Sequence, residues 1–409
     1  MSPLTQNEPI GAESGRGKKE RPWLRRIVVA FVGLTAVSVA VSLWLLYSRH
    51  LPVATGPYAV GRADYYWVDE SRAEILTAEP DDNRPLIVQI WYPSDDVTGC
   101  AAAPYFPHLR ELSGSFHAYE VLGIAPMKTH SYLDAPVSVK ESEFPVLLFS
   151  PGANSFIGLY TSILEELVSH GYVVVAMDHA YDNRGQVLPD GKVLESVFDK
   201  EHPRFDDPAG MEAMNAYYRK FVGIRAADAQ SILRRLEALN QSDVRFMGRL
   251  DLDRVGVLGH SLGGVAAAEA AKLEPRFKAA ANLDGHFMDR PKFDDGDPLR
   301  AVFLHMGDPF PPMPEQGSDT SMSRFEQSMN SIQAASYSVW ITGANHQNFS
   351  DDPLLKPGNT ARELEINAAV RAYLVAFFDY ALKGKPTPLL AAGPSADHGY
   401  ISVSVYPSE

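Results

Sequence analysis

The chain has 409 residues, of which 45% are hydrophobic and 22% are charged. These values are typical of a folded globular protein and exclude a largely disordered chain, and the length suffices for one large domain or two medium ones. The formal net charge of −14 argues against a nucleic acid as partner.

The N-terminal region has the opposite charge to the rest of the chain. Residues 1–50 hold seven basic and three acidic residues, a net charge of +4, which leaves −18 for the remainder. Residues 1–26, rich in Gly, Glu, Lys and Pro, are predicted to form a flexible cytoplasmic tail.

Residues 27–47 contain no charged side chain and are long enough, at about 1.5 Å per residue, to cross a bilayer core of about 30 Å. Basic residues precede this segment, and only Arg49 follows it closely. We therefore predict a transmembrane anchor with the bulk of the chain on the extracytoplasmic side. A cleaved signal, which would give a secreted protein, and a buried core helix are the alternatives.

A linker is predicted for residues 48–60 and a single domain for residues 61–409. The only cysteine, Cys100, cannot form an intrachain disulfide. The sequence contains no recognisable Cys/His metal cluster or phosphate-binding glycine loop, so we predict neither a metal nor a cofactor.

The first half of this domain begins with two predicted strands, 65–68 and 85–93. Loops and short helices are predicted for residues 101–140, and we expect them to lie near the mouth of the active site. The apolar run 144–150 is typical of a buried parallel strand, and the loop 151–155 after it can point a backbone N–H inward. A helix over 158–170 and a strand over 172–178 complete a βαβ unit.

Residues 182–215 are acidic and rich in proline at their start, which favours a lid-like insertion with a hairpin turn at 188–191. From Met211 an amphipathic helix is predicted. Arg225 interrupts its apolar face. An arginine in such a place most often snorkels or pairs with a carboxylate, so we expect a structural role and not a ligand.

The next strand leads directly into Gly259-His-Ser-Leu-Gly263, which fits the G-x-S-x-G pattern of a nucleophile elbow. A serine in so tight a strand-to-helix turn has a strained backbone, and the residues two before and two after it must be small. Gly259 and Gly263 meet that need. The alternative is a glycine-rich turn that holds a serine by chance.

Three further apolar runs, 279–284, 299–307 and 337–342, alternate with helical segments. This order predicts a mostly parallel sheet with helices on both faces. The last helix begins at a capping box of Thr360 and Glu363 and ends at Gly384, and residues 401–405 are a candidate edge strand.

A serine hydroxyl needs a base, and the base needs an acid that orients it. His346 follows the last core strand, where an elbow-type hydrolase places its base, although His286 and His305 are rivals. Asp284 and Asp308 each follow a strand after the elbow. Chain order alone favours Asp308 as the acid.

Residues 259–264 (Gly-His-Ser-Leu-Gly-Gly), 282–285 (Asn-Leu-Asp-Gly) and 346–351 (His-Gln-Asn-Phe-Ser-Asp) together resemble the plasma-type platelet-activating-factor acetylhydrolase family. The likeness extends over most of residues 85–352. It implies the α/β-hydrolase fold, a serine esterase activity, and Asp284 as the acid. The family has His-Gly in the oxyanion loop where this chain has Pro151-Gly152, which leaves the backbone N–H groups of Ala153 and Leu262 as the expected oxyanion donors.

The expected function is therefore a serine carboxylic-ester hydrolase with an acyl-enzyme intermediate. The resemblance implies esters with a short acyl group, including phospholipids that carry one at the second glycerol carbon. An acyltransferase or polyester hydrolase with the same triad is one alternative. A catalytically inactive binding protein on the same fold is another, and the presence of a serine, a histidine and two eligible acids argues against it.

Overall fold

The computed structural model describes residues 22–47, 51–79, 81–125, 127–203, 208–287, 298–309, 325–356, 360–396 and 398–406. The chain divides into two compact units, Met1–Ser48 and Arg49–Glu409.

The first unit contains the helix α1, Pro22–Tyr47. Its segment Pro22–Leu43 has a mean hydropathy of 2.1 and none of it is buried, so by length and composition it could cross a membrane. Residues 1–21 of the predicted flexible tail lie outside the described residues, whereas residues 22–26 are helical. The proline at the first helical position accounts for this earlier start, because its fixed φ suits a helix N-terminus.

The second unit is built on a mixed sheet that has twelve strands within the described residues, in the order β13-β14-β12-β11-β10-β9-β5-β6-β2-β1-β4-β3. The strands are β1 (Ala59–Ala73), β2 (Asn83–Ser94), β3 (Ala102–Pro104), β4 (Lys128–Leu133), β5 (Phe144–Ser150), β6 (Val173–His179), β9 (Leu250–His260), β10 (Phe277–Leu283), β11 (Val302–Gly307), β12 (Ser336–Ile341), β13 (Gly393–Pro394) and β14 (Ile401–Tyr406). A separate hairpin joins β7 (Gln186–Val187) to β8 (Val193–Leu194).

The centre of the sheet is parallel, from β6 through β5, β9, β10 and β11 to β12. Antiparallel strands flank it: β2 pairs with β6 and β1, and β14 pairs with β12. The predicted α/β architecture is thus confirmed. Residues 401–405 form the predicted strand, as part of β14. Its predicted place at the edge of the sheet is wrong, because the short strand β13 pairs with its outer side.

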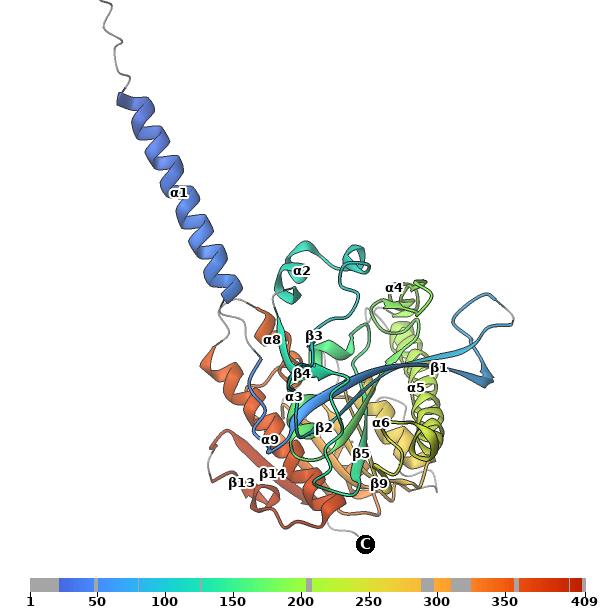
Figure 1. Cartoon of the computed structure of the whole chain (residues 1–409). Helices are drawn as coiled ribbons and strands as arrows, with labels where there is room; N and C mark the ends of the chain where they lie inside the picture. Colours follow the sequence, from blue (N-terminus) through green and yellow to red (C-terminus); the bar gives the residue numbers. More distant parts are fainter. Residues whose placement is uncertain are drawn as a thin grey trace, which may run out of the picture. The chain divides into compact units, whose positions relative to one another are not determined.

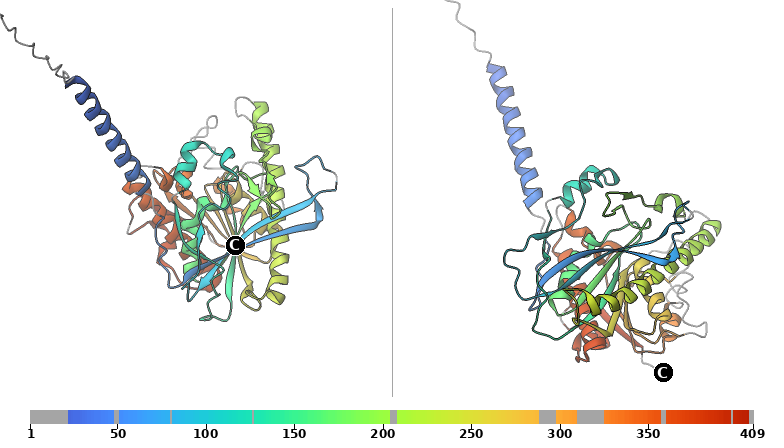
Figure 2. Two further views of the ribbon diagram at one scale, coloured as in Figure 1. Left: turned by 45° about the horizontal axis from the view of Figure 1, so that its top comes forward. Right: turned by 45° about the vertical axis from the view of Figure 1, so that its right-hand side comes forward.

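Helices cover both faces of this sheet, as Figures 1 and 2 show. Side chains alternate along each buried strand, so that Leu147 and Phe149 of β5 join one core cluster and Val146 and Leu148 join the other. The first cluster packs against α3 (Thr161–Ser169) and α9 (Ala361–Lys383), and the second against α5 (Pro208–Ser242) and α6 (Leu262–Leu273).

Short elements fill the connections. The region 101–140, predicted as loops and short helices, contains α2 (Ala118–Ile124) but also the strands β3 and β4. The helix predicted over 158–170 is α3 preceded by a 3-10 turn, Ile157–Tyr160. The remaining short helices and 3-10 turns are Ser113–Ser115, α4 (Phe198–Glu201), His346–Phe349, α8 (Asp352–Leu355) and Pro388–Leu390.

The predicted turn and cap signals are confirmed. Glu363 N–H donates to the Thr360 hydroxyl at 3.2 Å, Thr360 N–H donates to the Glu363 carboxylate at 2.6 Å, and α9 ends at Gly384 with φ 64°. Gly191 N–H donates to the Leu188 carbonyl at 2.9 Å and closes the hairpin between β7 and β8.

Part of the predicted linker 48–60 lies against the second unit. Leu51 is buried, Thr55 N–H donates to a Glu166 carboxylate oxygen at 3.2 Å, and Gly56 N–H donates to the Ser169 hydroxyl at 3.1 Å. Residues 51–58 are therefore held on α3 by hydrogen bonds that the composition of the segment does not reveal.

Candidate active site

Ser261 lies in the turn between β9 and α6, with φ 55° and ψ −125°. This conformation is costly for a residue with a side chain and persists only where the surrounding structure enforces it. Ser261 N–H donates to the Leu283 carbonyl at 2.8 Å, which ties the turn to the end of β10. The strained elbow predicted from the sequence is present.

The glycines around Ser261 allow the turn to pack closely. A Cβ at Gly259 would collide with the backbone of Gly263, and a Cβ at Gly263 would collide with the Ser150 and Pro151 carbonyls. The end of β5 therefore approaches the elbow so closely that only glycine fits at either position.

His346 begins the 3-10 turn that follows β12, and its Nδ1 lies 2.7 Å from Oδ2 of Asp284. Burial raises the pKa of Asp284, but the hydrogen bond and charge of His346 outweigh burial and leave that pKa below its ordinary value. An ionised Asp284 then fixes Nδ1 as the protonated nitrogen, so Nε2 is left to accept a proton.

The loop that carries Asp284 is held by its own neighbours. Asp284 has φ 53°, and its N–H donates to the Met306 carbonyl at 2.7 Å. Both polar atoms of the Asn282 side chain bond the backbone of Gly285, at 2.8 and 2.9 Å. The Asn-Leu-Asp-Gly motif is thus a tight turn that presents a carboxylate beside His346.

A cavity of about 430 Å³ brings Ser261, His346 and Ala153 together. Asp284 lies behind His346, and Leu262 is buried as the first residue of α6. The other lining residues are Glu120, Gly152, Asn154, Ser155, Phe156, Leu159, Tyr160, Arg184, Phe198, His260, Gln347, Ser350, Asp352 and Lys356.

The rival candidates lie near Asp284 but do not form the contact that joins it to His346. His305 is buried against the rings of Phe325 and Trp340, with ring centroids 4.6 and 5.3 Å apart, and burial lowers its pKa to about 4. Asp308 directly follows β11, while Nδ1 of His346 is bound to Asp284. His286 is also on the Asp284 loop, and burial lowers its pKa.

Sequence reasoning missed a chain of hydrogen bonds behind the elbow. His260 is buried, which lowers its pKa to about 3 and keeps it neutral. Its Nε2 lies 3.0 Å from the His346 carbonyl and its Nδ1 lies 2.9 Å from the Tyr160 hydroxyl, so Nε2–H donates and Nδ1 accepts. Tyr160 in turn accepts from Gly152 N–H at 3.0 Å. His346, the turn that holds Ser261 and the 151–155 loop are thereby linked.

Ion pairs line the outer part of the cavity. Arg184 bonds Glu120 at 2.6 Å, and Lys356 bonds Asp352 at 2.5 Å. Glu120 comes from α2, while Arg184 and Phe198 come from the segment 182–215. Phe156, Leu159 and Tyr160 add apolar surface to the cavity.

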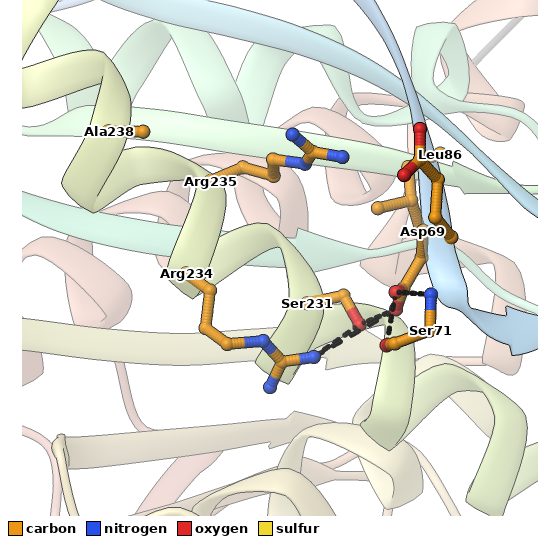
Figure 3. Close-up of a pocket in the computed structure, with 8 residues that line it drawn as sticks. Asp69, Ser71, Leu86, Ser231, Arg234, Arg235 and Ala238 are labelled. Carbon is orange, nitrogen blue, oxygen red and sulfur yellow. Dashed lines mark hydrogen bonds and ion pairs between the residues drawn. The ribbon is translucent and has the colours of Figure 1, made fainter.

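A second cavity, of about 320 Å³, lies between β1 and α5 (Figure 3). The Asp69 carboxylate there accepts hydrogen bonds from the Ser71 hydroxyl at 2.6 Å and from the Ser231 hydroxyl, and Arg234 Nη2 donates to Ser231 at 3.0 Å. Arg235 donates to the Val68 carbonyl at 2.6 Å. These side chains bind one another and hold β1 on α5, so we assign them a structural role.

The part of the chain that the structure describes contains no cluster of three or more His, Cys, Asp or Glu side chains placed to hold a metal ion.

Comparison with known proteins gives one consistent result. A family model described as platelet-activating factor acetylhydrolase, isoform II, matches residues 46–376. A probable 1-alkyl-2-acetylglycerophosphocholine esterase of Arthroderma benhamiae is 27% identical over 396 residues, which cover 85% of this chain and 92% of that protein. A platelet-activating factor acetylhydrolase of Gallus gallus is 26% identical over 277 residues, 57% of this chain and 60% of that protein. Among solved structures, a ferulic acid esterase from Streptomyces cinnamoneus superimposes with a TM-score of 0.67 and 26% identity, covering 87% of this chain and 99% of that one.

Proposed function

The chain belongs to the platelet-activating factor acetylhydrolase, isoform II, family, and from this premise we propose that it is a serine carboxylic-ester hydrolase with Ser261 as nucleophile, His346 as base and Asp284 as acid. The resemblance noted in the sequence is thereby confirmed. The observation that carries the proposal is the 2.7 Å contact between His346 and Asp284 at a cavity that His346 shares with Ser261.

In the first step, Ser261 Oγ attacks the ester carbonyl carbon while His346 Nε2 takes the hydroxyl proton. The carbonyl π electrons move to oxygen and give a tetrahedral oxyanion. Asp284 accepts a hydrogen bond from Nδ1–H and stabilises the imidazolium that forms. His346 then returns the proton to the leaving alcohol as the C–O bond breaks.

The acyl group remains on Ser261 until a water attacks it. His346 takes a proton from that water, and a second oxyanion forms. As this collapses, the bond between the acyl carbon and Ser261 Oγ breaks and His346 returns the proton to Oγ, which releases the carboxylic acid and restores the free serine. In both steps the proposed oxyanion donors are the backbone N–H groups of Leu262 and Ala153. Loss of one such donor typically costs about 3 kcal/mol of transition-state stabilisation.

The proposed substrates are esters with a short acyl group, including phospholipids that carry one at the second glycerol carbon. The names of the relatives support this class. The solved neighbour favours esters of an aromatic acid as a second candidate. An acyltransferase or polyester hydrolase would use the same three side chains and would differ in its acceptor or acyl donor. An inactive binding protein would fail to turn over any of these.

We further propose that α1 anchors the chain in a membrane with its N-terminus in the cytoplasm. We also propose that the segment 182–215 forms a lid over the site. The basic residues before α1 support the orientation. The positions of Arg184 and Phe198 at the cavity support the second statement.

The test is hydrolysis of nitrophenyl esters from two to sixteen carbons, and of a feruloyl ester, by the full chain in detergent. We expect a preference for short acyl groups, loss of about 10⁴-fold or more in kcat for Ser261→Ala, and a loss of similar order for Asp284→Asn. Asp308→Asn serves as the matched control and should retain activity. If Asp308→Asn abolishes turnover and Asp284→Asn does not, the assignment of the acid is wrong.

A further inference from the structure

The peptide group between Gly152 and Ala153 is held through its carbonyl, because Asn183 Nδ2 donates to the Gly152 oxygen at 3.1 Å. The preceding peptide is held through its N–H, which Gly152 donates to the Tyr160 hydroxyl at 3.0 Å. We propose that Asn183 is a positioning residue that aims the Ala153 N–H at the oxyanion. This inference rests on the proposed function.

The direction of the Ala153 N–H follows from peptide geometry. In a trans peptide the C=O and the N–H point to opposite sides of the chain. The Gly152 carbonyl points to the buried Asn183, whereas Ala153 and Ser261 both line the cavity. The loop is also close to the nucleophile, since a Cβ added at Gly152 would lie 3.6 Å from the Ser261 Cβ.

The orientation of the Asn183 amide is fixed by three backbone groups. Its Oδ1 accepts from His179 N–H at 2.7 Å, and its Nδ2 donates to the carbonyls of Gly152 and Ser155, both at 3.1 Å. The flipped amide would place its oxygen against two carbonyls and its NH₂ against an N–H. Because Asn183 is fully buried, water cannot replace these contacts.

Arg225 supports the same loop from α5. Its guanidinium donates to the Pro151 carbonyl and, at 3.4 Å, to the Gly152 carbonyl, and it is held by Asp182 at 2.6 Å. Of the two arrangements expected for Arg225, a snorkelling side chain or an ion pair, the structure has the ion pair. A cation on the carbonyl side polarises the peptide and strengthens the N–H on the other side as a donor.

The loop departs from the family pattern at Pro151. Pro151 has no N–H, so this residue can be held only through its carbonyl, which accepts from Arg225. Asn183 touches no substrate atom in this account. Its effect is on the stabilisation of the tetrahedral oxyanion and therefore on kcat more than on KM.

The experiment compares Asn183→Leu with Gln186→Met in the full chain. Gln186 is also a buried amide of the 182–215 segment, but its Nε2 donates to the His179 carbonyl at 3.3 Å and not to the oxyanion loop. For Asn183→Leu we expect kcat on a nitrophenyl ester to fall by about 10- to 100-fold with KM within about threefold, since loss of a whole donor costs about 10²- to 10³-fold. Binding of a trifluoromethyl ketone, which forms a tetrahedral oxyanion on the serine, should weaken by a similar factor. Gln186→Met should keep kcat within about threefold.

Equal kcat values for the two folded variants would overturn the inference, as would a fall in kcat without any loss of trifluoromethyl ketone affinity. If Asn183→Leu does not fold, Asn183→Asp retains the acceptor for His179 N–H and removes the donor at alkaline pH, and the same comparison applies to it. Ser261→Ala distinguishes a failure of the proposed function from a failure of the proposed role of Asn183. Activity in Ser261→Ala would refute the proposed function, whereas an inactive Ser261→Ala with a fully active Asn183→Leu would refute only the role of Asn183.

Discussion

At the scale of single residues, Tyr160 connects two parts of the site that are remote in the chain. Its hydroxyl accepts from Gly152 N–H at 3.0 Å and donates to His260, whose other nitrogen donates to the His346 carbonyl. The Tyr160 hydroxyl thus helps to position the 151–155 loop and, through His260, the proposed base His346. A buried hydroxyl of this kind contributes about 1 kcal/mol to stability, and its loss leaves partners unsatisfied.

We therefore expect Tyr160→Phe to lower kcat by about tenfold while costing about 1–2 kcal/mol of unfolding free energy. Tyr172→Phe is the matched control, because the buried Tyr172 hydroxyl bonds Asp379 at 2.8 Å, away from the site. The control should lose comparable stability and keep its kcat. Steady-state kinetics and urea unfolding of both variants decide the matter, and equal kcat values would contradict this role for Tyr160.

The sequence predicts some of these residues and not others for a physical reason. Ser261 is signalled by the glycines that its turn requires, and His346 by its place after a strand. The choice of Asp284 over Asp308 depended on resemblance, because each follows a strand of the same sheet. Tyr160 and Asn183 leave no local signal. Their contacts arise only when β5, α3 and β6 pack together.

At the scale of elements, the end of β6 contains a carboxyl group whose pKa links stability to pH. Asp178 accepts a hydrogen bond from Ile157 N–H at 3.2 Å. Burial raises its pKa to about 7, although this hydrogen bond and the charge of Arg225 oppose the rise. The folded protein therefore keeps a proton on Asp178 between about pH 4 and 7, where the unfolded chain has released it. This contribution to stability is full below pH 4 and is lost as the pH rises to about 7.

Asp178→Asn keeps the acceptor and removes the titration. The free energy of unfolding of Asp178→Asn, minus that of the wild type, should be larger at pH 8 than at pH 5 by about 3 kcal/mol, because the wild type loses about 1.4 kcal/mol per pH unit between pH 5 and 7. Urea unfolding at the two pH values measures the difference. A difference between the proteins that does not change with pH would show that Asp178 is already ionised in the fold.

Strands with long apolar runs were easier to predict from the sequence than short strands that are only partly buried. The central strands β5 and β6 and the second half of β9 are mainly apolar and buried, and the sequence indicated all three. The strands β3 and β4 are short and only partly buried, so no period distinguishes them from loops. The error at β14 came from β13, a two-residue strand that a sequence cannot reveal.

At the scale of the whole molecule, a basic N-terminal region with an apolar helix precedes an acidic remainder. If α1 is an anchor, the full chain should remain in the membrane fraction after extraction with alkaline carbonate, and it should retain its N-terminus. Immunoblotting of the fractions with an N-terminal epitope tag checks both points. Release into the supernatant, with a mature N-terminus near residues 53–56, would show a cleaved signal instead.

The central claim is that Ser261 is made nucleophilic by His346 and Asp284. Labelling of the full chain with a fluorophosphonate, followed by peptide mapping, tests it most directly, because the probe bonds covalently to an activated serine. We expect one adduct, on Ser261, that forms in the wild type and at least about 10³-fold more slowly in His346→Ala. An adduct on another serine, or ester hydrolysis that persists without any adduct on Ser261, would contradict the account.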